Sequence, residues 1–197
     1  MKGEIRRCQL AIEKALAGMD TALVSSGDAG IYGMAGLVLE LLADQDLPDK
    51  VGVEVIPGIP ALSAAAALLG APLMHDFAVI SLSDLMTPWE IIRQRVEAAA
   101  KADFVLVIYN PKSGKRDWQL EEVRKLILKF RGGHTPVGIV RNATRAGESI
   151  HITTLSRLDE IQVDMLSIIM VGNSMTRTLG GRMVTPRGYM EKYCSKI

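Results

Sequence analysis

The loop VSSGDAGIYG, residues 24–33, is the first stretch whose residue types could hold a ligand. Glycines at 27, 30 and 33 surround one carboxylate, Asp28, directly after an apolar segment. Glycine has no Cβ atom, so it lets the main chain approach a ligand closely. The spacing does not match GxGxxG, so the loop is not a dinucleotide-binding fingerprint. We interpret it as a ligand-binding loop, with an ordinary turn as the open alternative.

Small or polar residues also follow other predicted strands. They occur in PGIPALS (57–63), YNPKSG (109–114), VRNATR (140–145) and VGNS (171–174). Ligands of open α/β sheets bind beyond the carboxyl ends of the strands, so we expect these ends to converge on a ligand of adenosine-like shape. The stretch PKSGKRD (111–117) lacks the first glycine and the Ser/Thr of a Walker phosphate loop, and we interpret it as a basic surface loop.

His75 and Asp76 form the one neighbouring pair with the chemistry for acid–base work. A structural hydrogen bond between two domains is the alternative interpretation of this pair. His134 and His151 are isolated from it and from any cysteine, so no metal site is expected. The sequence contains no GxSxG motif, so it does not indicate a serine hydrolase.

Alternating strands and helices must position these loops. We expect helices at 5–16, 35–43, 60–70, 87–101 and 117–132, and strands at 21–26, 51–57, 77–82, 103–110, 135–142, 149–155 and 166–173. Repeated strand–loop–helix units favour an α/β fold with a parallel sheet under helices. Thr87 is expected to cap one helix, with Pro88 as its first residue. A change of character near residues 71–76 predicts two domains, 1–72 and 73–197.

Composition excludes several classes of function. The 197 residues are 48% hydrophobic and 23% charged, with a net charge of +1, which gives no field that would attract nucleic acid. Aromatic residues make up 5%, too few for a base-stacking surface. Two distant cysteines, Cys8 and Cys194, fit a reducing cytoplasm. No apolar run is long enough for a membrane-spanning helix, so no membrane partner is expected.

Several stretches together carry a resemblance to a known family. They are VSSGDAGIYGMAG (24–36), HDFAVISLSDLMTPW (75–89), GIVRNATRAGES (138–149) and RMVTPRGY (182–189), beside the PGIPA and YNPKSG motifs. The chain resembles the tetrapyrrole (corrin/porphyrin) methylases through nearly its whole length. The second and fourth stretches are similar to the branch that methylates C17 of a precorrin-3-type tetrapyrrole and contracts its ring in cobalamin biosynthesis.

The resemblance implies two α/β domains, a mainly parallel N-terminal sheet and a mixed C-terminal sheet. It also implies S-adenosylmethionine bound in a trough between the domains, a tetrapyrrole substrate and a homodimer. Residues carried over from the family's cofactor motifs are Gly27, Asp28, Ile31, Tyr32, Pro60, Ala61, Asn110, Asn142, Ala143 and Ser167.

The resemblance also frames the chemistry. Methyl transfer from a sulfonium to an electron-rich macrocycle requires alignment and desolvation from the protein. Ring contraction requires proton transfers, for which His75, Asp76 and Asp84 are the candidates. Tetrapyrrole carboxylates favour arginine partners, and Arg141, Arg145, Arg177, Arg182 and Arg187 lie in strand-end or loop segments. Ordinary surface arginines are the alternative.

One family feature does not occur in this sequence, a first strand ending in GxGPGD. We therefore expect the N-terminal α/β domain to be incomplete and turnover by this chain to be weak. An inactive cofactor-binding or dimerising remnant stays open as an alternative function. A methylase of the same fold that acts on RNA or on a protein residue is a second alternative, disfavoured for RNA by the neutral charge.

Overall fold

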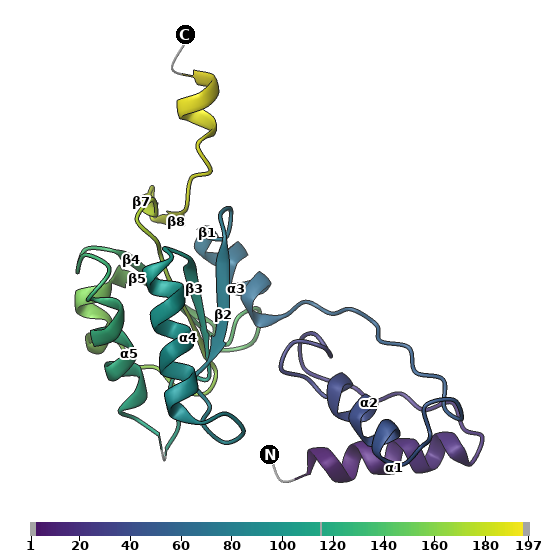
Figure 1. The fold of residues 1–197 in the computed structure, drawn as a ribbon. Coiled ribbons are helices and arrows are strands. Elements are labelled where there is room, and N and C mark those ends of the chain that lie inside the picture. The colour runs from purple at the N-terminus through teal and green to yellow at the C-terminus, as the bar shows by residue number, and fades with distance from the viewer. Residues whose placement is uncertain (1–2, 115, 195–197) are drawn as a thin grey trace. The chain divides into compact units, whose positions relative to one another are not determined.

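A computed structural model describes residues 3–114 and 116–194 of the chain (Figure 1). The chain divides into two compact units, Met1–Pro60 and Ala61–Ile197, which we call unit 1 and unit 2 and describe separately. None of the helices in the described ranges has the length and apolar character needed to cross a membrane.

Unit 1 is built on two helices, α1 (Glu4–Leu16) and α2 (Ala35–Asp44), which pack against each other. Apolar residues recur at helical spacing in α1, so its inner stripe buries Cys8 and Ile12, and α2 buries Leu42. The chain leaves α1 through Gly18, whose φ of +82° is the left-handed conformation that commonly ends helices. Both helices were predicted from the sequence.

The two strands expected in unit 1, at 21–26 and 51–57, are not formed. Within the described residues no sheet includes either segment, and their apolar side chains are exposed, to 84% for Val24 and 72% for Ile56. A strand is stable only when a neighbour accepts and donates its ladder hydrogen bonds. The β-prone composition of these segments does not supply such a partner, so the prediction of an N-terminal sheet was wrong for these residues.

Unit 2 contains a five-stranded mixed sheet in the order β2-β3-β6-β4-β5. Its strands are β2 (Phe77–Ser81), β3 (Val105–Tyr109), β4 (Pro136–Arg141), β5 (Ser149–Thr154) and β6 (Ser167–Val171). Only the β2–β3 pair is parallel; β6 runs antiparallel to both β3 and β4, and β5 runs antiparallel to β4. The five predicted strands and the mixed C-terminal sheet are therefore confirmed.

Helices cover both faces of this sheet (Figure 1). On one face α4 (Trp89–Lys101), α5 (Gln119–Ile127) and the short 3-10 helix η1 (Leu155–Glu160) bury a large core around Leu106, Ile108 and Ile169. On the other face α3 (Ala61–Leu69) packs on Val107 and Val140. The cap of α4 is Pro88, one residue later than expected, and Thr87 lies outside the helix.

A second, small sheet and a final short helix were not predicted. The sheet joins β1 (Gly70–Ala71), β8 (Arg182–Val184) and β7 (Arg177–Leu179), and the helix η2 spans Met190–Cys194. Strands of two or three residues carry too little periodicity to be detected in a sequence.

The units divide at Pro60 and Ala61, whereas the sequence placed the boundary between residues 72 and 73. The residues between these two points form α3 and β1. Leu69 and Ala65 of α3 are fully buried in the core that also contains Val107 and Val140, so α3 belongs to unit 2.

Candidate functional site

The carboxyl ends of β2, β3 and β4 lie at one edge of the large sheet, which we call the strand-end edge. Ser81 at the end of β2 pairs with Tyr109 at the end of β3. Arg141 at the end of β4 pairs with Ser167 at the start of β6. Since β6 is antiparallel, the strand-end edge receives its first residue and not its last. Segment 171–174 therefore lies at the opposite edge, and the expectation that it joins the other strand ends was wrong.

Three residues at the strand-end edge have an uncommon backbone conformation. Asn110 directly follows β3 with φ +50°, and Asn142 and Thr144 follow β4 with φ +51° and +61°. A non-glycine residue rarely adopts positive φ, and such residues cluster at functional sites when their surroundings hold them there. The Asn110 side-chain amide donates to Ser81 Oγ at 2.9 Å, and the Asn142 main-chain N–H donates to the Leu166 carbonyl at 3.0 Å.

Ser167 and Arg141 are linked through a carboxylate that was not predicted, Asp164. Arg141 Nε lies 2.8 Å from Asp164 Oδ2, and Ser167 Oγ donates to Asp164 Oδ1 at 2.9 Å. Burial by itself raises the pKa of Asp164, but hydrogen bonds from Arg141, Ser167 and the Leu166 amide outweigh it and hold the pKa below its ordinary value. Part of the Arg141 guanidinium is therefore engaged within the chain, although Arg141 was predicted to bind substrate carboxylates.

Tyr109 was also missed as a site residue. Its hydroxyl accepts a hydrogen bond of 3.0 Å from the main-chain N–H of Leu62 in the first turn of α3. This bond brings Ala61, the first residue of α3, close to the end of β3, where Asn110 lies. The signal in the sequence was the position of a hydroxyl-bearing side chain at a strand end, beside the asparagine that was selected.

Asp28 organises the glycine loop of unit 1. Its Oδ1 accepts the main-chain N–H groups of Gly30 at 2.8 Å and Ile31 at 3.1 Å, and its Oδ2 accepts that of Gly58 at 2.9 Å. These bonds, with that from Gly58 the largest influence, lower the pKa of Asp28. The carboxylate thus ties the loop to segment 57–60, so its observed partners are main-chain groups of unit 1.

The loop and segment 57–60 approach so closely that glycine is required at the crossing. A Cβ atom on Gly58 would lie 2.9 Å from the Gly27 carbonyl carbon and 3.1 Å from Asp28 Cα. Gly27 has φ +84°, and Tyr32, further along the loop, has φ +53°. Pro60 Cα lies 3.7 Å from the place of a Cβ on Gly27. The main chain of the loop itself fills the space beside Gly58, so this crossing fixes the shape of the loop, and the cofactor assignment of the loop stays a prediction.

The structure does not bring the three predicted acid–base residues together. His75 and Asp76 directly precede β2 and lie at the opposite edge of the sheet, where the Asp76 carbonyl accepts from the Val105 N–H at 3.0 Å. The His75 ring is turned to its neighbour, with Nδ1 accepting the Asp76 main-chain N–H at 2.9 Å. Asp84 follows β2 and lies at the strand-end edge, where Gln119 Nε2 donates to it at 3.2 Å.

The remaining predicted arginines are spread over unit 2. Arg145 is exposed in the loop between β4 and β5, beside Asn142 and Ala143. Arg177 lies in β7 and Arg182 in β8, both exposed on the small sheet, and Arg187 is exposed after β8.

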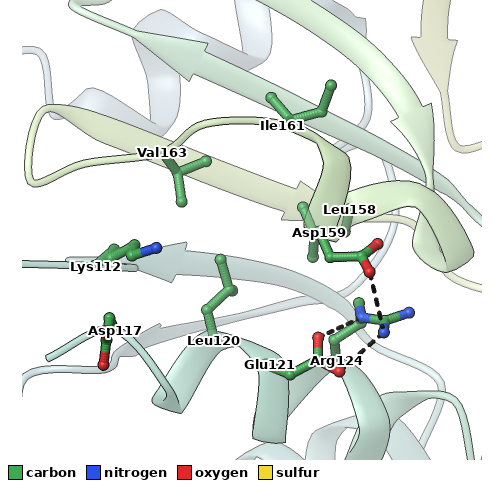
Figure 2. A pocket seen from close by; sticks show the side chains of 9 residues that line it. All are labelled: Lys112, Asp117, Leu120, Glu121, Arg124, Leu158, Asp159, Ile161 and Val163. Carbon is green, nitrogen blue, oxygen red and sulfur yellow. Dashed lines mark hydrogen bonds and ion pairs between the residues drawn. The ribbon is translucent and has the colours of Figure 1, made fainter.

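One surface pocket lies between α5, η1 and the segment before α5, and Figure 2 shows its side chains. Leu120, Leu158, Ile161 and Val163 form its apolar part, and Arg124 pairs there with Glu121 at 2.7 Å and Asp159 at 3.5 Å. None of the predicted site residues lines it. Arg124 is paired with carboxylates of the chain, and no predicted site residue lies there, so we assign the pocket no ligand. Among the described residues, no three His, Cys, Asp or Glu side chains are grouped to hold a metal ion.

Comparison with known proteins identifies the class. The family described as Tetrapyrrole (Corrin/Porphyrin) Methylases matches residues 3–159, and the chain belongs to this family. The solved structure of the methyltransferase CobJ covers 93% of this chain and 77% of its own, with a TM-score of 0.88 and 35% identity. The resemblance and the family fold expected from the sequence are therefore confirmed.

Two curated relatives are more specific. A protein named cobalt-factor III methyltransferase from Priestia megaterium is 50% identical over 195 residues, covering 98% of this chain and 36% of the relative. A protein named probable cobalt-factor III C(17)-methyltransferase from Salmonella typhimurium is 55% identical over 186 residues, covering 94% of this chain and 76% of the relative. The chain thus spans about a third of the first relative and three quarters of the second.

Proposed function

We propose that this protein is an S-adenosylmethionine-dependent methyltransferase of cobalamin biosynthesis. Its substrate would be a precorrin-3-type tetrapyrrole such as cobalt-factor III, methylated at C17 with contraction of the ring. The observation that carries the proposal is the 55% identity to the Salmonella relative of that name over 94% of this chain. The fold of CobJ, itself a methyltransferase by name, supports it.

The methyl donor supplies an activated methyl group on a sulfonium, so the protein does not have to activate it. Groups proposed to hold the donor are the glycine loop with Gly27 and Asp28, and the strand-end residues Asn110, Asn142 and Ser167. The tight main-chain crossing at Gly58 and the positive φ of both asparagines support this assignment. Ile31, Tyr32, Pro60, Ala61 and Ala143 complete the proposed set.

The protein's own part is alignment, exclusion of water and proton transfer. Of the proposed acid–base residues, Asp84 has the better support, because it lies at the strand-end edge. His75 and Asp76 remain candidates at the opposite edge. Arg145, Arg177 and Arg182 are proposed to pair with substrate carboxylates, and Arg141 to do so through the nitrogens that Asp164 does not engage.

Binding of the demethylated product, S-adenosylhomocysteine, and methyl transfer to cobalt-factor III test the proposal. Calorimetry measures binding, and mass spectrometry detects one added methyl group on the tetrapyrrole. Gly27→Val should abolish both, because a β-branched residue at φ +84° distorts the loop. Gly18→Val is the matched control, since Gly18 has φ +82° at the end of α1 and nothing lies within 4 Å of the position that its Cβ would take.

Two results would contradict the proposal. Failure of the parent chain to bind S-adenosylhomocysteine would remove the donor assignment. Donor binding with methyl transfer only to RNA or protein would favour another substrate class, the alternative left open by the fold. An inactive remnant is not favoured, since the relatives carry enzyme names.

Two further properties belong to the proposal. A homodimer is proposed from the family resemblance, and light scattering of the purified chain measures it. A cytoplasmic location is supported by two cysteines, Cys8 and Cys194, that are both free.

A further inference from the structure

Arg116 is a buried charge at the strand-end edge, with 7% of the residue exposed. Its Nη1 donates to two main-chain carbonyls, that of Leu82 directly after β2 and, at 2.9 Å, that of Asn110 directly after β3. One guanidinium nitrogen therefore joins the ends of two neighbouring strands. Both carbonyls lie just beyond the last ladder pair of β2 and β3, so the arginine supplies hydrogen bonds to them where the ladder no longer does.

Other contacts fix the guanidinium in place. Its Nε lies 3.7 Å from Asp84 Oδ1, and its Nη2 lies 3.6 Å from Met165 Sδ. Asp84 is held in turn by Gln119 Nε2 at 3.2 Å, from the first residue of α5. Burying a guanidinium is unfavourable unless hydrogen bonds and an opposite charge compensate, and these contacts supply both.

The conformation of Asn110 has such support. Its φ of +50° is uncommon for a residue with a side chain, although asparagine adopts it more readily than most, and here neighbouring groups fix it. Arg116 holds its carbonyl, and Ser81 Oγ holds its side-chain amide at 2.9 Å. We infer that Arg116 is a positioning residue for the donor site, which orders the main chain at Leu82 and Asn110 without touching the ligand. This inference rests on the proposed function.

Arg131 provides a control within the same sheet. It is also 7% exposed, and its two Nη atoms donate to the main-chain carbonyls of Gly172, after β6, and Phe104, before β3. Its Nε lies 4.0 Å from Asp103 Oδ1. Like Arg116, Arg131 is a buried guanidinium that donates to two main-chain carbonyls near a carboxylate, but these carbonyls are at the opposite edge, away from Asn110. Substitution of either arginine should thus lower the stability of the sheet, whereas only substitution of Arg116 should also lower the affinity for the donor.

The test compares Arg116→Lys with Arg131→Lys. Lysine keeps the charge, but its side chain ends one bond short of the Nη atoms and cannot also make the contacts of Nε and Nη2. Hydrogen exchange should accelerate at residues 81–84 and 109–110 in Arg116→Lys, and at 103–105 and 172–174 in Arg131→Lys. If the ordered strand ends fall to about a tenth of the population, the dissociation constant for S-adenosylhomocysteine rises about tenfold. The dissociation constant of Arg131→Lys should stay within about twofold of that of the parent, although its melting temperature is similar to that of Arg116→Lys.

Two outcomes would overturn the inference. In the first, the variants lose the same affinity, which would assign Arg116 to general stability. In the second, exchange accelerates at 109–110 while the affinity of Arg116→Lys equals that of the parent, so the order of Asn110 would not matter for binding. A parent chain that binds no S-adenosylhomocysteine would instead refute the proposed function, and the inference with it.

Discussion

The crossing of the glycine loop with segment 57–60 gives the sharpest prediction, through Gly58→Ala. The new Cβ would lie 2.9 Å from the Gly27 carbonyl carbon and 3.1 Å from Asp28 Cα. Carbon atoms in comfortable contact are about 3.5–4.0 Å apart, so the two segments must separate by about 1 Å. Both close neighbours are main chain, which cannot turn aside as a flexible side chain does. The separation also lengthens the 2.9 Å bond from the Gly58 N–H to Asp28 Oδ2.

A shift of about 1 Å in a substrate-positioning element can lower a rate on the order of a hundredfold. We therefore expect Gly58→Ala to bind S-adenosylhomocysteine weakly and to methylate cobalt-factor III about a hundredfold more slowly. Gly52→Ala, six residues before Gly58, is the control, because nothing lies within 4 Å of its Cβ position. Calorimetry and single-turnover kinetics on both variants check the expectation. Parent-like binding and turnover in Gly58→Ala would refute the reasoning that this crossing shapes the donor site.

Three further predictions concern the core, the loop and the substrate. Gly138→Ala should destabilise the chain by about 1–3 kcal/mol, since the added Cβ would lie 2.5 Å from Leu69 Cδ1. Thermal unfolding measures this, and the same change should cost less in a Leu69→Ala background, whereas an equal cost in both backgrounds would refute the clash. Because the pKa of Asp28 is lowered, its hydrogen bonds stabilise the folded loop fully at pH values above the ordinary aspartate pKa. This stabilisation is lost as the pH falls through the lower, folded-state value. The Gly58 amide resonance should accordingly titrate with a midpoint below the ordinary aspartate pKa, and a midpoint at or above that value would contradict this. Arg177→Ala should weaken tetrapyrrole binding by about 1.5–3 kcal/mol while leaving S-adenosylhomocysteine affinity unchanged, and equal tetrapyrrole affinity would assign Arg177 to plain surface.

The spacing of apolar residues predicted an element correctly wherever that element has a regular apolar pattern within its own segment. The stripe that contains Cys8 and Ile12 predicted α1, and the apolar run at 103–110 predicted β3, because burial on one or both faces is written into such spacing. The same reasoning failed at 21–26 and 51–57. These segments are also rich in apolar residues, but a strand needs a partner as well, and the partner is not encoded in the segment itself.

The candidate site divides in the same way. Gly27, Asn110 and Asn142 were selected from the sequence as residues that follow a predicted strand, and all three have the positive φ that glycine and asparagine tolerate. Asp164 and Arg116 were missed. The arginine that pairs with Asp164 is distant along the chain, and Arg116 binds main-chain carbonyls, which no sequence motif marks. Asp28 was selected as a cofactor residue, but the structure shows its oxygens on the amides of Gly30, Ile31 and Gly58.

The sequence by itself determined the family, the helices α1 to α5, the five strands of the large sheet and the residue types at the strand ends, because each depends on short-range pattern or on motifs. Only the tertiary structure decided which ends meet. The antiparallel direction of β6 brings Ser167 to Arg141 and sends segment 171–174 to the other edge, where it cannot join Asn110 and Asn142. Strand direction follows from how the whole sheet buries its two faces, and no single segment contains that information.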